Sequence, residues 1–183
     1  MRMEVEQKFR VDSLAKIERR LKKLNATVGE PQEEVDLYFA HPSRDFAQTD
    51  EALRIRRKGR QSFVTYKGPK IDSTTKTRRE IDLPIDSPDD WQALLEALGF
   101  RPVAEVRKRR RKAVLDWSAR EIEISLDDVD RLGPFVELEI VTDAGQVDPA
   151  REAIRLLAAA LGLVENERRS YLGMLLAGLR PST

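Results

Sequence analysis

The chain has 183 residues, 40% of them hydrophobic and 36% charged, and its 33 basic and 32 acidic residues give a net charge of +1. This composition suits a folded chain with a substantial core, and the near-zero net charge argues against a non-specific nucleic-acid binder. There is no cysteine and only one histidine, His41, which excludes disulfides, thiolate metal sites and multi-histidine metal sites and nearly excludes a Ser-His-Asp triad. Any metal must therefore be bound by carboxylates, which favours the hard ions Mg²⁺, Mn²⁺ or Ca²⁺.

Five strands and one helix are predicted in the first half of the chain. Residues 3–11 alternate strictly between apolar and polar side chains, which is typical of a strand, and Asp12 and Ser13 then open a helix. Residues 41–50 are rich in turn formers, and Pro84 is expected to end the fifth strand. The predicted elements are a strand at 3–11, a helix at 13–25, and strands at 33–40, 51–58, 62–68 and 76–83.

The second half predicts three strands between helices. Ser87 and Pro88 start a helix that Gly99 stops, and Asp148 with Pro149 opens another. The predicted elements are helices at 88–98, 148–161 and 166–178, and strands at 102–115, 120–127 and 134–142. The sequence therefore predicts an α+β fold of one domain, residues 1–183, in which eight sequential antiparallel strands close as a meander into a β-barrel with helices packed outside.

In most of these strands one face is apolar and the other carries charge at every second residue. The charged faces comprise Glu4, Glu6 and Lys8; Arg54, Arg56 and Lys58; Arg78, Glu80 and Asp82; Lys108 and Arg110; Glu121, Glu123 and Asp127; and Glu137 and Glu139. An ordinary sheet with its charged face in water has the same periodicity. Two observations favour a charged interior instead: the amphipathic helices need apolar strand faces to cover, and acids and bases are partly sorted by strand, whereas a solvated surface more often mixes the two signs.

A charged interior is unfavourable when empty, because each buried unpaired charge costs on the order of several kcal/mol. It becomes favourable when water, a polyanion and cations fill it, since basic side chains bind phosphate oxygens and carboxylates bind the metal. Arginine suits this role because its planar fork binds phosphate oxygens in pairs. This interpretation predicts a tunnel that binds a polyanion together with a metal.

Several short segments, in order along the chain, resemble the conserved blocks of the CYTH family, also called triphosphate tunnel metalloenzymes. Residues 4–8 (EVEQK) are similar to the ExExK signature of that family. The other similar segments are DLYF at 36–39, ALRIR at 52–56, TYKGP at 65–69, REI at 79–81, VRKRR at 106–110, LDDV at 126–129, LG at 132–133, VELE at 136–139 and RSYL at 169–172. The resemblance spans residues from about 4 to 175 and implies an eight-stranded antiparallel barrel with a central tunnel.

The resemblance also implies roles for individual residues. The metal, Mg²⁺ or Mn²⁺ and two ions in all, is assigned to Glu4, Glu6, Glu137 and Glu139, with Asp127 joining them or acting through water. The triphosphate is assigned to Lys8, Arg54, Arg56, Lys67, Lys108 and Arg110, with Arg169 at a C-terminal lid. The candidate catalytic residues are Lys67, Glu80 and Asp127, of which Glu80 orients a basic neighbour or a second metal.

One ambiguity lies in the basic run at 107–112. The K-x-R pattern of the family fits either Lys108 with Arg110 or Arg107 with Arg109, because both pairs are two residues apart. The first pair aligns better with the family block, so we expect it to face the tunnel and the second pair to face outward. The tyrosine that usually follows this block is Ala113 here.

Members of the family hydrolyse or cyclise triphosphates with Mg²⁺ or Mn²⁺. The Lys108/Arg110 pair and the segments 132–135 and 169–171 are most similar to class IV adenylyl cyclases, which implies conversion of ATP to cyclic AMP and pyrophosphate. A triphosphatase acting on inorganic tripolyphosphate, thiamine triphosphate or a nucleotide is the alternative. A non-catalytic polyphosphate- or nucleotide-binding module is the third possibility.

The expected partners and location follow from the same observations. The substrate is a small triphosphate, ATP or tripolyphosphate, and no nucleic-acid partner is expected. No apolar run approaches the roughly 20 residues of a membrane span, and the first residues lack the apolar core of a signal peptide, so we expect a cytoplasmic protein without a membrane partner. Barrels of this family can pair, so a homodimer is compatible with the resemblance.

Overall fold

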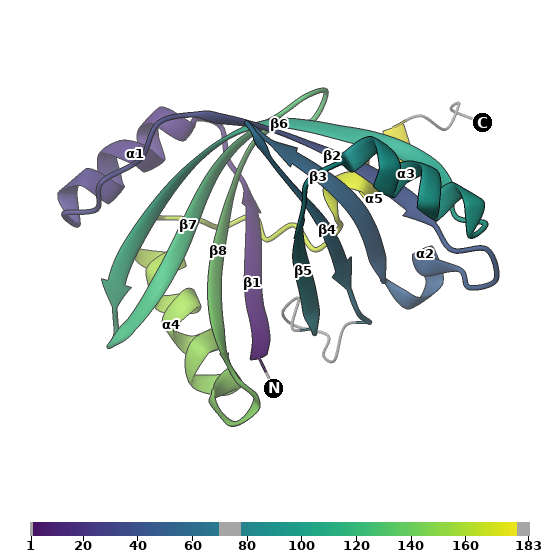
Figure 1. Ribbon diagram of the computed structural model, residues 1–183. Coiled ribbons are helices and arrows are strands. Elements are labelled where there is room, and N and C mark those ends of the chain that lie inside the picture. Colours follow the sequence, from purple (N-terminus) through teal and green to yellow (C-terminus); the bar gives the residue numbers. More distant parts are fainter. Residues whose placement is uncertain (1, 70–77, 179–183) are drawn as a thin grey trace.

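The computed structural model describes residues 2–69 and 78–178. Its eight strands are β1 Arg2–Arg10, β2 Gln32–Ala40, β3 Ala52–Lys58, β4 Gln61–Lys67, β5 Glu80–Ile85, β6 Arg101–Trp117, β7 Arg120–Val129 and β8 Gly133–Asp143. Its helices are α1 Leu14–Lys23, α2 Phe46–Thr49, α3 Pro88–Ala97, the 3-10 turn η1 Ala144–Gln146, α4 Val147–Ala160 and α5 Tyr171–Gly178. All the strands form one antiparallel sheet, which curls into an arch (Figure 1). The α+β class and the curled eight-stranded sheet confirm the predicted fold.

The order of strands in the sheet is not the predicted simple meander. The order is β1-β8-β7-β6-β2-β3-β4-β5, so β2 pairs with β6 and β1 pairs with β8. The prediction of strand order was wrong because the alternation of apolar and charged residues along a strand identifies its apolar face, but does not identify the strand that pairs with it. The pairing places the basic strands β3 and β6 on either side of β2, which becomes important at the site.

The two edge strands of the arch, β1 and β5, lie side by side at its centre (Figure 1). At one end of β1, Glu4 forms an isolated bridge with Arg78, just before β5, with Glu4 N donating to Arg78 O at 3.4 Å. At the other end, residues 165–167 run along β1: Arg10 N donates to Glu165 O at 3.1 Å, and Glu167 N donates to Lys8 O at 2.7 Å. The bridge to Arg78 links β1 to the segment just before β5, so the curled sheet forms a half-barrel whose two edge strands approach each other there.

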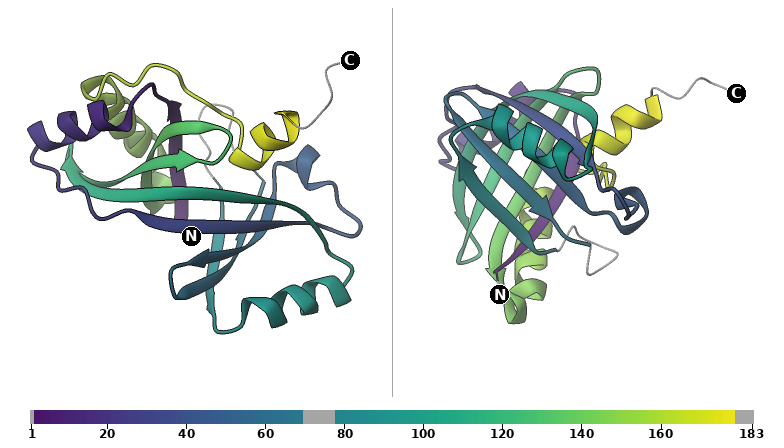
Figure 2. Two further views of the ribbon diagram at one scale, coloured as in Figure 1. Left: turned by 90° about the horizontal axis from the view of Figure 1, so that it is seen from above. Right: turned by 45° about the vertical axis from the view of Figure 1, so that its right-hand side comes forward.

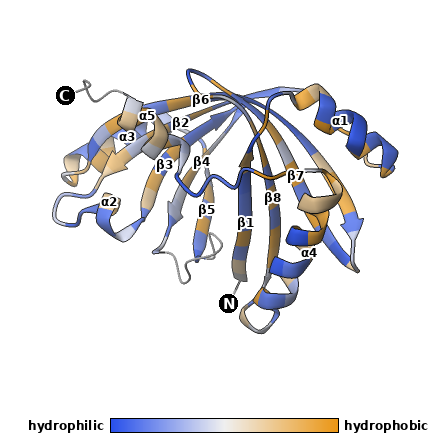
Figure 3. Cartoon of the chain, turned by 180° about the vertical axis from the view of Figure 1, so that it is seen from behind, coloured by the Kyte–Doolittle hydropathy of each residue, from blue (hydrophilic) through white to orange (hydrophobic). Residues whose placement is uncertain are grey.

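Three helices cover the apolar outer faces of the strands, as predicted. The largest core cluster joins α1 and α4 to the sheet and includes fully buried Val5, Ile124, Leu138, Ile154 and Leu157. A second outer cluster places α3 against β3 and β4. The alternation of hydrophilic and hydrophobic residues along the strands is visible in Figure 3. With the apolar faces covered, the charged faces are left on the concave side.

The last helix, α5, packs differently. Its residues Tyr171, Met174 and Leu175 form a cluster with Tyr38, Val106, Val129 and Phe135. These four strand residues lie an even number of positions from charged residues such as Asp36, Lys108, Asp127 and Glu137, so they belong to the concave face. Helix α5 therefore covers apolar side chains at one end of the interior.

Several predicted element ends differ from the structure. The helix predicted at 166–178 begins only at Tyr171, because residues 165–167 pair with β1 instead. Strand β5 continues through Pro84 to Ile85, since β5 is an edge strand and Pro84 needs no ladder partner on its open side. Within the turn-rich segment 41–50, a single helical turn, α2, is capped by Asp45, whose side chain accepts from Ala47 N at 3.0 Å. The first residues of the predicted 76–83 strand lie outside the described residues.

Candidate active site

The concave face of the sheet surrounds a cavity of about 270 Å³, called here the charged cavity. It is lined by eleven of the predicted site residues, contributed by β1, β3, β4, β5, β6 and β8: Glu4, Glu6, Lys8, Arg54, Arg56, Lys67, Glu80, Lys108, Arg110, Glu137 and Glu139. The period of two in each strand brings these side chains to one face, and the curl of the sheet turns that face inward. Asp127 and Arg169 are not among the lining residues.

One side of the charged cavity carries three carboxylates, Glu4, Glu6 and Glu139, called here the acidic cluster. Glu6 and Glu139 are paired across β1 and β8, and one oxygen from each of the three carboxylates lies within 4.8 Å of the others. Burial and the neighbouring acids raise the pKa of Glu139 to about 7, and burial raises that of Glu4 well above its usual range. A divalent cation would relieve this repulsion, and three carboxylate oxygens are the donors that Mg²⁺ and Mn²⁺ prefer. The acidic cluster therefore fits a metal of that class.

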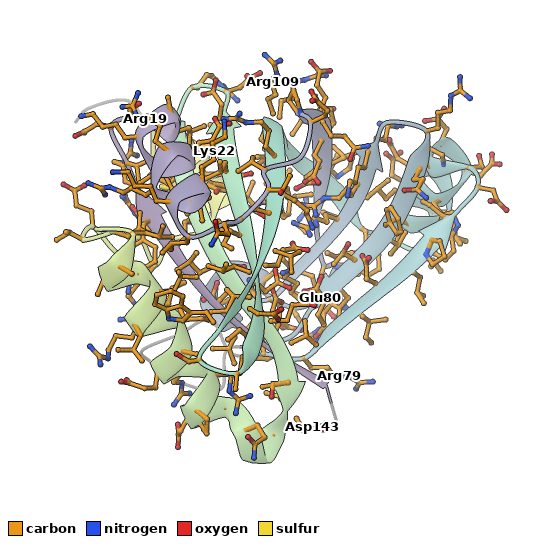
Figure 4. The ribbon with its side chains drawn as sticks, turned by 90° about the vertical axis from the view of Figure 1, so that its left-hand side faces the viewer. Arg19, Lys22, Arg79, Glu80, Arg109 and Asp143 are labelled. Carbon is orange, nitrogen blue, oxygen red and sulfur yellow. The ribbon has the colours of Figure 1, made fainter. Side chains whose placement is uncertain are left out.

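Lys67 on β4 connects the acidic cluster to β5. Its Nζ lies 2.8 Å from Glu4 Oε1 and 2.8 Å from Glu80 Oε2. Burial lowers the pKa of Lys67, but the two carboxylates outweigh it and raise that pKa above its usual value, so Lys67 stays positively charged. Burial opposes ionisation of Glu80, yet its contacts with Glu4 and Lys67 lower its pKa to about 2. Glu80 lies among the side chains between the strands, whereas Arg79 lies at the lower edge (Figure 4).

The other side carries four bases, Arg54 and Arg56 of β3 and Lys108 and Arg110 of β6, called here the basic wall. Nε of Arg54 is buried and has no hydrogen-bond partner among the described residues. A buried donor without a partner is costly unless a ligand satisfies it. The basic wall thus supplies donors for an anion across the cavity from the acidic cluster.

The structure distinguishes the two pairs in the basic run of β6. Lys108 and Arg110 are 4% and 7% exposed and line the charged cavity. Arg107 and Arg109 are exposed, and Figure 4 shows Arg109 at the same upper edge of the molecule as Arg19 and Lys22 of α1. The pair that faces the cavity is therefore the one that fits the family block better.

Asp127 lies apart from the acidic cluster. It is fully buried, and its Oδ1 accepts from Arg110 Nε at 2.6 Å while its Oδ2 accepts from the Tyr171 hydroxyl at 2.8 Å. Arg110 also pairs with Glu137. Asp127 and Glu137 therefore pair with Arg110. Neither belongs to the acidic cluster, whose carboxylates are close enough to bind one metal ion.

A second and larger cavity of about 1020 Å³, called here the mouth cavity, adjoins the charged cavity. The two share six lining residues: Tyr38, Asp50, Glu51, Ala52, Ser170 and Leu172. The mouth cavity lies between the β2–β3 connection with α2 and the start of α5, which lie near each other in Figure 2. Its lining includes the apolar side chains Phe39, Phe46, Val103 and Leu176. Its chemistry therefore differs from that of the charged cavity.

His41 and Arg169 both line the mouth cavity. The Nδ1 atom of His41 accepts from the backbone N–H groups of Ser43 and Arg44, each at 3.1 Å, which fixes the turn after His41. Arg169 is 62% exposed at its side chain and pairs with Glu167. The structure thus places Arg169 beside the mouth cavity and not with the basic wall.

Sequence reasoning assigned no role to several residues at the site. Arg78 is 7% exposed, lines the charged cavity and donates through Nη1 to Asp50 O at 3.1 Å; its even spacing from Glu80 was a usable signal. Tyr171 lies under the ammonium group of Lys8, with Nζ 4.1 Å from the ring centroid. No pattern in the sequence connects Tyr171 to β1, because the two are brought together by the pairing of residues 165–167 with β1 and by the docking of α5.

The comparisons with known proteins agree with this geometry. The CYTH domain family matches residues 2–171. A Methanocaldococcus jannaschii protein named as a candidate adenylate cyclase is 39% identical over 173 residues, which cover 93% of this chain and 97% of that protein. In the part of the chain that the structure describes, no helix is long and apolar enough to cross a membrane.

Two solved structures are similar in sequence and in fold. The Pyrococcus horikoshii protein PH1819 is 38% identical with a TM-score of 0.84, covering 96% of this chain and 99% of that one. A candidate adenylate cyclase from Vibrio parahaemolyticus is 27% identical with a TM-score of 0.82, covering 95% of this chain and 98% of that one. The family match across nearly the whole chain, together with the acidic cluster and basic wall around one cavity, shows that this protein belongs to the CYTH family.

Proposed function

We propose that this protein is a metal-dependent enzyme acting on a triphosphate, and specifically an adenylyl cyclase that converts ATP to cyclic AMP and pyrophosphate. The observation that carries this proposal is the opposition of the acidic cluster and the basic wall across one cavity of about 270 Å³. Phosphoryl and nucleotidyl transfer depend mainly on positioning and charge neutralisation. The charged cavity supplies both.

The roles within the charged cavity follow from charge and position. The acidic cluster would hold a Mg²⁺ or Mn²⁺ ion, which when bound neutralises phosphate oxygens and polarises the phosphorus. A second ion, as expected from the resemblance, remains part of the proposal. Lys8 and the basic wall bind phosphate oxygens, and Lys67, held positively charged between Glu4 and Glu80, neutralises charge that develops on the leaving group.

The proposed reaction is an intramolecular displacement. The 3′-oxygen of ATP forms a bond to the α-phosphorus, the bond from that phosphorus to the bridging oxygen breaks, and pyrophosphate leaves. The proton of the 3′-hydroxyl passes through solvent to the pyrophosphate, so the charges balance. The chain's contribution is to hold the triphosphate in line and to exclude competing water, and Asp127 contributes by orienting Arg110.

The mouth cavity favours an organic triphosphate over an inorganic one. It shares six lining residues with the charged cavity and adds apolar side chains such as Phe46, Val103 and Leu176, with which a phosphate chain has no favourable contacts. A nucleoside attached to the triphosphate would occupy it. The alternative, a triphosphatase acting on tripolyphosphate, needs only the charged cavity, and a non-catalytic binding module would bind a triphosphate without turnover.

The contribution of the mouth cavity can be tested with one substitution and a matched control. Val103→Trp fills part of the mouth cavity, whereas Val114→Trp introduces the same side chain at another exposed valine of the same strand that lines neither cavity. The two valines are 41% and 51% exposed. We expect Val103→Trp to weaken ATP binding about tenfold or more, because losing a base-sized contact costs on the order of 1–3 kcal/mol. Both proteins should bind tripolyphosphate equally well.

Isothermal titration with ATP and with tripolyphosphate, in the presence of Mg²⁺, measures these affinities. If Val103→Trp leaves ATP binding within twofold of the control, the nucleoside does not occupy the mouth cavity. In that case the triphosphatase alternative gains support, because the mouth cavity is the feature on which the preference for an organic triphosphate rests.

A further inference from the structure

Two carboxylates on β2, Glu34 and Asp36, lie behind the basic wall. Their residues are 1% and 0% exposed, which is unusual for charged side chains unless they are paired. Because β2 pairs with β3 on one side and with β6 on the other, these acids lie between the two strands that carry the basic wall. Neither lines the charged cavity, so neither contacts a ligand there directly.

Asp36 alone holds three of the four bases. Its Oδ1 accepts from Arg56 Nε at 2.6 Å and its Oδ2 from Arg56 Nη2 at 2.7 Å, which is a bidentate pair. The same Oδ2 lies 3.3 Å from Arg54 Nη1 and 3.2 Å from Lys108 Nζ. A single carboxylate therefore fixes one guanidinium in its plane and touches two further cations.

Glu34 extends this arrangement to the fourth base. Its Oε2 lies 3.2 Å from Lys108 Nζ, 3.5 Å from Arg56 Nη2 and 3.9 Å from Arg110 Nε. Arg110 is held from its other side by Asp127. Every member of the basic wall thus has a buried carboxylate beside it.

The electrostatics keep both acids ionised. Burial would raise the pKa of Asp36, but Arg54, Lys108 and Arg56 outweigh it and hold that pKa well below its usual range. Burial is likewise outweighed at Glu34 by Arg110, Lys108 and Arg56, and the pKa of Glu34 falls to about 2. Four cations gathered around a small cavity would otherwise repel one another and turn outward to water.

The bidentate pair leaves part of Arg56 available. A guanidinium has five N–H donors, and Asp36 accepts from Nε and Nη2 only. Arg56 also lines the charged cavity, so its remaining donors can bind an anion while the carboxylate fixes the plane of the fork. Pre-organised donors lose less conformational entropy when they bind.

We propose that Asp36, assisted by Glu34, is a positioning residue that sets the geometry of the basic wall for three linked phosphates. This inference rests on the proposed triphosphate site and adds residues that neither the resemblance nor the comparisons assign. The positioning role predicts the opposite change in anion affinity from the one that net charge alone predicts. Removing a negative charge near an anion site should tighten binding if only net charge matters, whereas removing a positioning carboxylate should weaken binding and reduce the preference for three phosphates.

The test compares Asp36→Asn with Glu33→Gln, which neutralises an exposed carboxylate three residues away on the same strand. Titration calorimetry with tripolyphosphate and with pyrophosphate, at two salt concentrations, gives the four dissociation constants for each protein. We expect Asp36→Asn to raise the dissociation constant for tripolyphosphate at least tenfold and to raise it more than the constant for pyrophosphate, so that the preference for tripolyphosphate falls. Glu33→Gln should stay within twofold of the unmodified protein. Equal or tighter tripolyphosphate binding by Asp36→Asn would overturn the inference.

A second variant covers the case in which Asp36→Asn does not fold, which is a real risk because it leaves buried charges partly unpaired. Glu34→Gln keeps the shape of its side chain and leaves the Asp36 contacts intact, and we expect it to weaken tripolyphosphate binding by about threefold to tenfold with the same loss of preference over pyrophosphate. The ratio of the two constants is informative because partial unfolding lowers both affinities equally. If the unmodified protein fails to bind tripolyphosphate, the proposed function itself is wrong; if it binds and both variants keep its preference, only the positioning role is wrong.

Discussion

At the scale of single residues, buried carboxylates of this protein respond to their surroundings in opposite directions. Glu139, among other acids, has a pKa raised to about 7, whereas Glu34, among the basic wall, has a pKa lowered to about 2. Both are largely buried, so burial alone does not decide the direction. The sign of the neighbouring charges decides the direction of the pKa shift. A raised pKa marks an acid among other acids, where a cation would bind favourably, and a lowered pKa marks an acid that is already paired with basic side chains.

The raised pKa of Glu139 predicts how stability depends on pH when no metal is bound. An acid whose pKa is higher in the folded state than in the unfolded state stabilises the fold fully below its unfolded pKa of about 4.5, and this contribution is lost as pH rises through about 7. We therefore expect the free energy of unfolding, in EDTA, to fall by up to about 3 kcal/mol between pH 5 and pH 8. Glu34 and Asp36 do not contribute in this range, because their lowered pKa values affect stability only at more acidic pH.

Urea unfolding at several pH values measures this slope. Glu139→Gln should reduce the slope, part of which remains because the pKa of Glu4 is also raised. Glu121→Gln, which changes an exposed acid on β7, should leave the slope unchanged. Added Mg²⁺ should also flatten it by binding the ionised cluster. A metal-free protein whose stability rises over this range would contradict the pKa assignment.

The sequence predicts the position and partners of some site residues better than those of others. The period of two identifies Glu4, Glu6 and Lys108 as members of charged faces, and the curl of the sheet brings them together. It gives no indication that Asp127 pairs with Arg110 rather than with a metal, because both uses place an acid on a charged face. Glu34 was missed for a related reason, since its role depends on having β3 and β6 as neighbours.

At the scale of elements, α5 has the least predictable position. The sequence predicts its existence, but an apolar helix with no polar stripe does not indicate which surface it covers. In the structure, Met174 and Leu175 pack on Val106 and Phe135 of the concave face, and Tyr171 donates to Asp127. Helix α5 is therefore linked to the basic wall through Asp127, which pairs with Arg110.

The packing of α5 predicts a specific loss of stability. Met174→Ala should lower the free energy of unfolding by roughly 2–5 kcal/mol, because Met174 is 5% exposed and its removal leaves a cavity. Leu156→Ala in α4 is the matched control, since Leu156 is 38% exposed and its loss should cost less than about 1 kcal/mol. Thermal denaturation of the two variants compares them directly. Equal destabilisation would mean that α5 does not pack into the interior as described.

At the scale of the whole molecule, one curled sheet separates two environments. The helices α1, α3 and α4 take the apolar outer faces, which leaves the charged faces to surround a cavity large enough for a small polyanion. The adjoining mouth cavity is bounded by the β2–β3 connection and α5, which are distant in sequence. The arrangement is suited to a ligand that is highly charged at one end and organic at the other.

The central claim is that the charged cavity turns over a triphosphate, and product analysis tests it most directly. The protein is incubated with ATP and, separately, with tripolyphosphate, in Mg²⁺ and in Mn²⁺, and the products are followed by phosphorus NMR, with Glu6→Gln as the control that removes one carboxylate of the acidic cluster. We predict cyclic AMP and pyrophosphate from ATP, and no metal-dependent product from Glu6→Gln although it folds normally. Orthophosphate released from tripolyphosphate with ATP untouched would contradict the cyclase proposal, and no turnover of either compound in either metal would contradict the enzyme proposal as a whole.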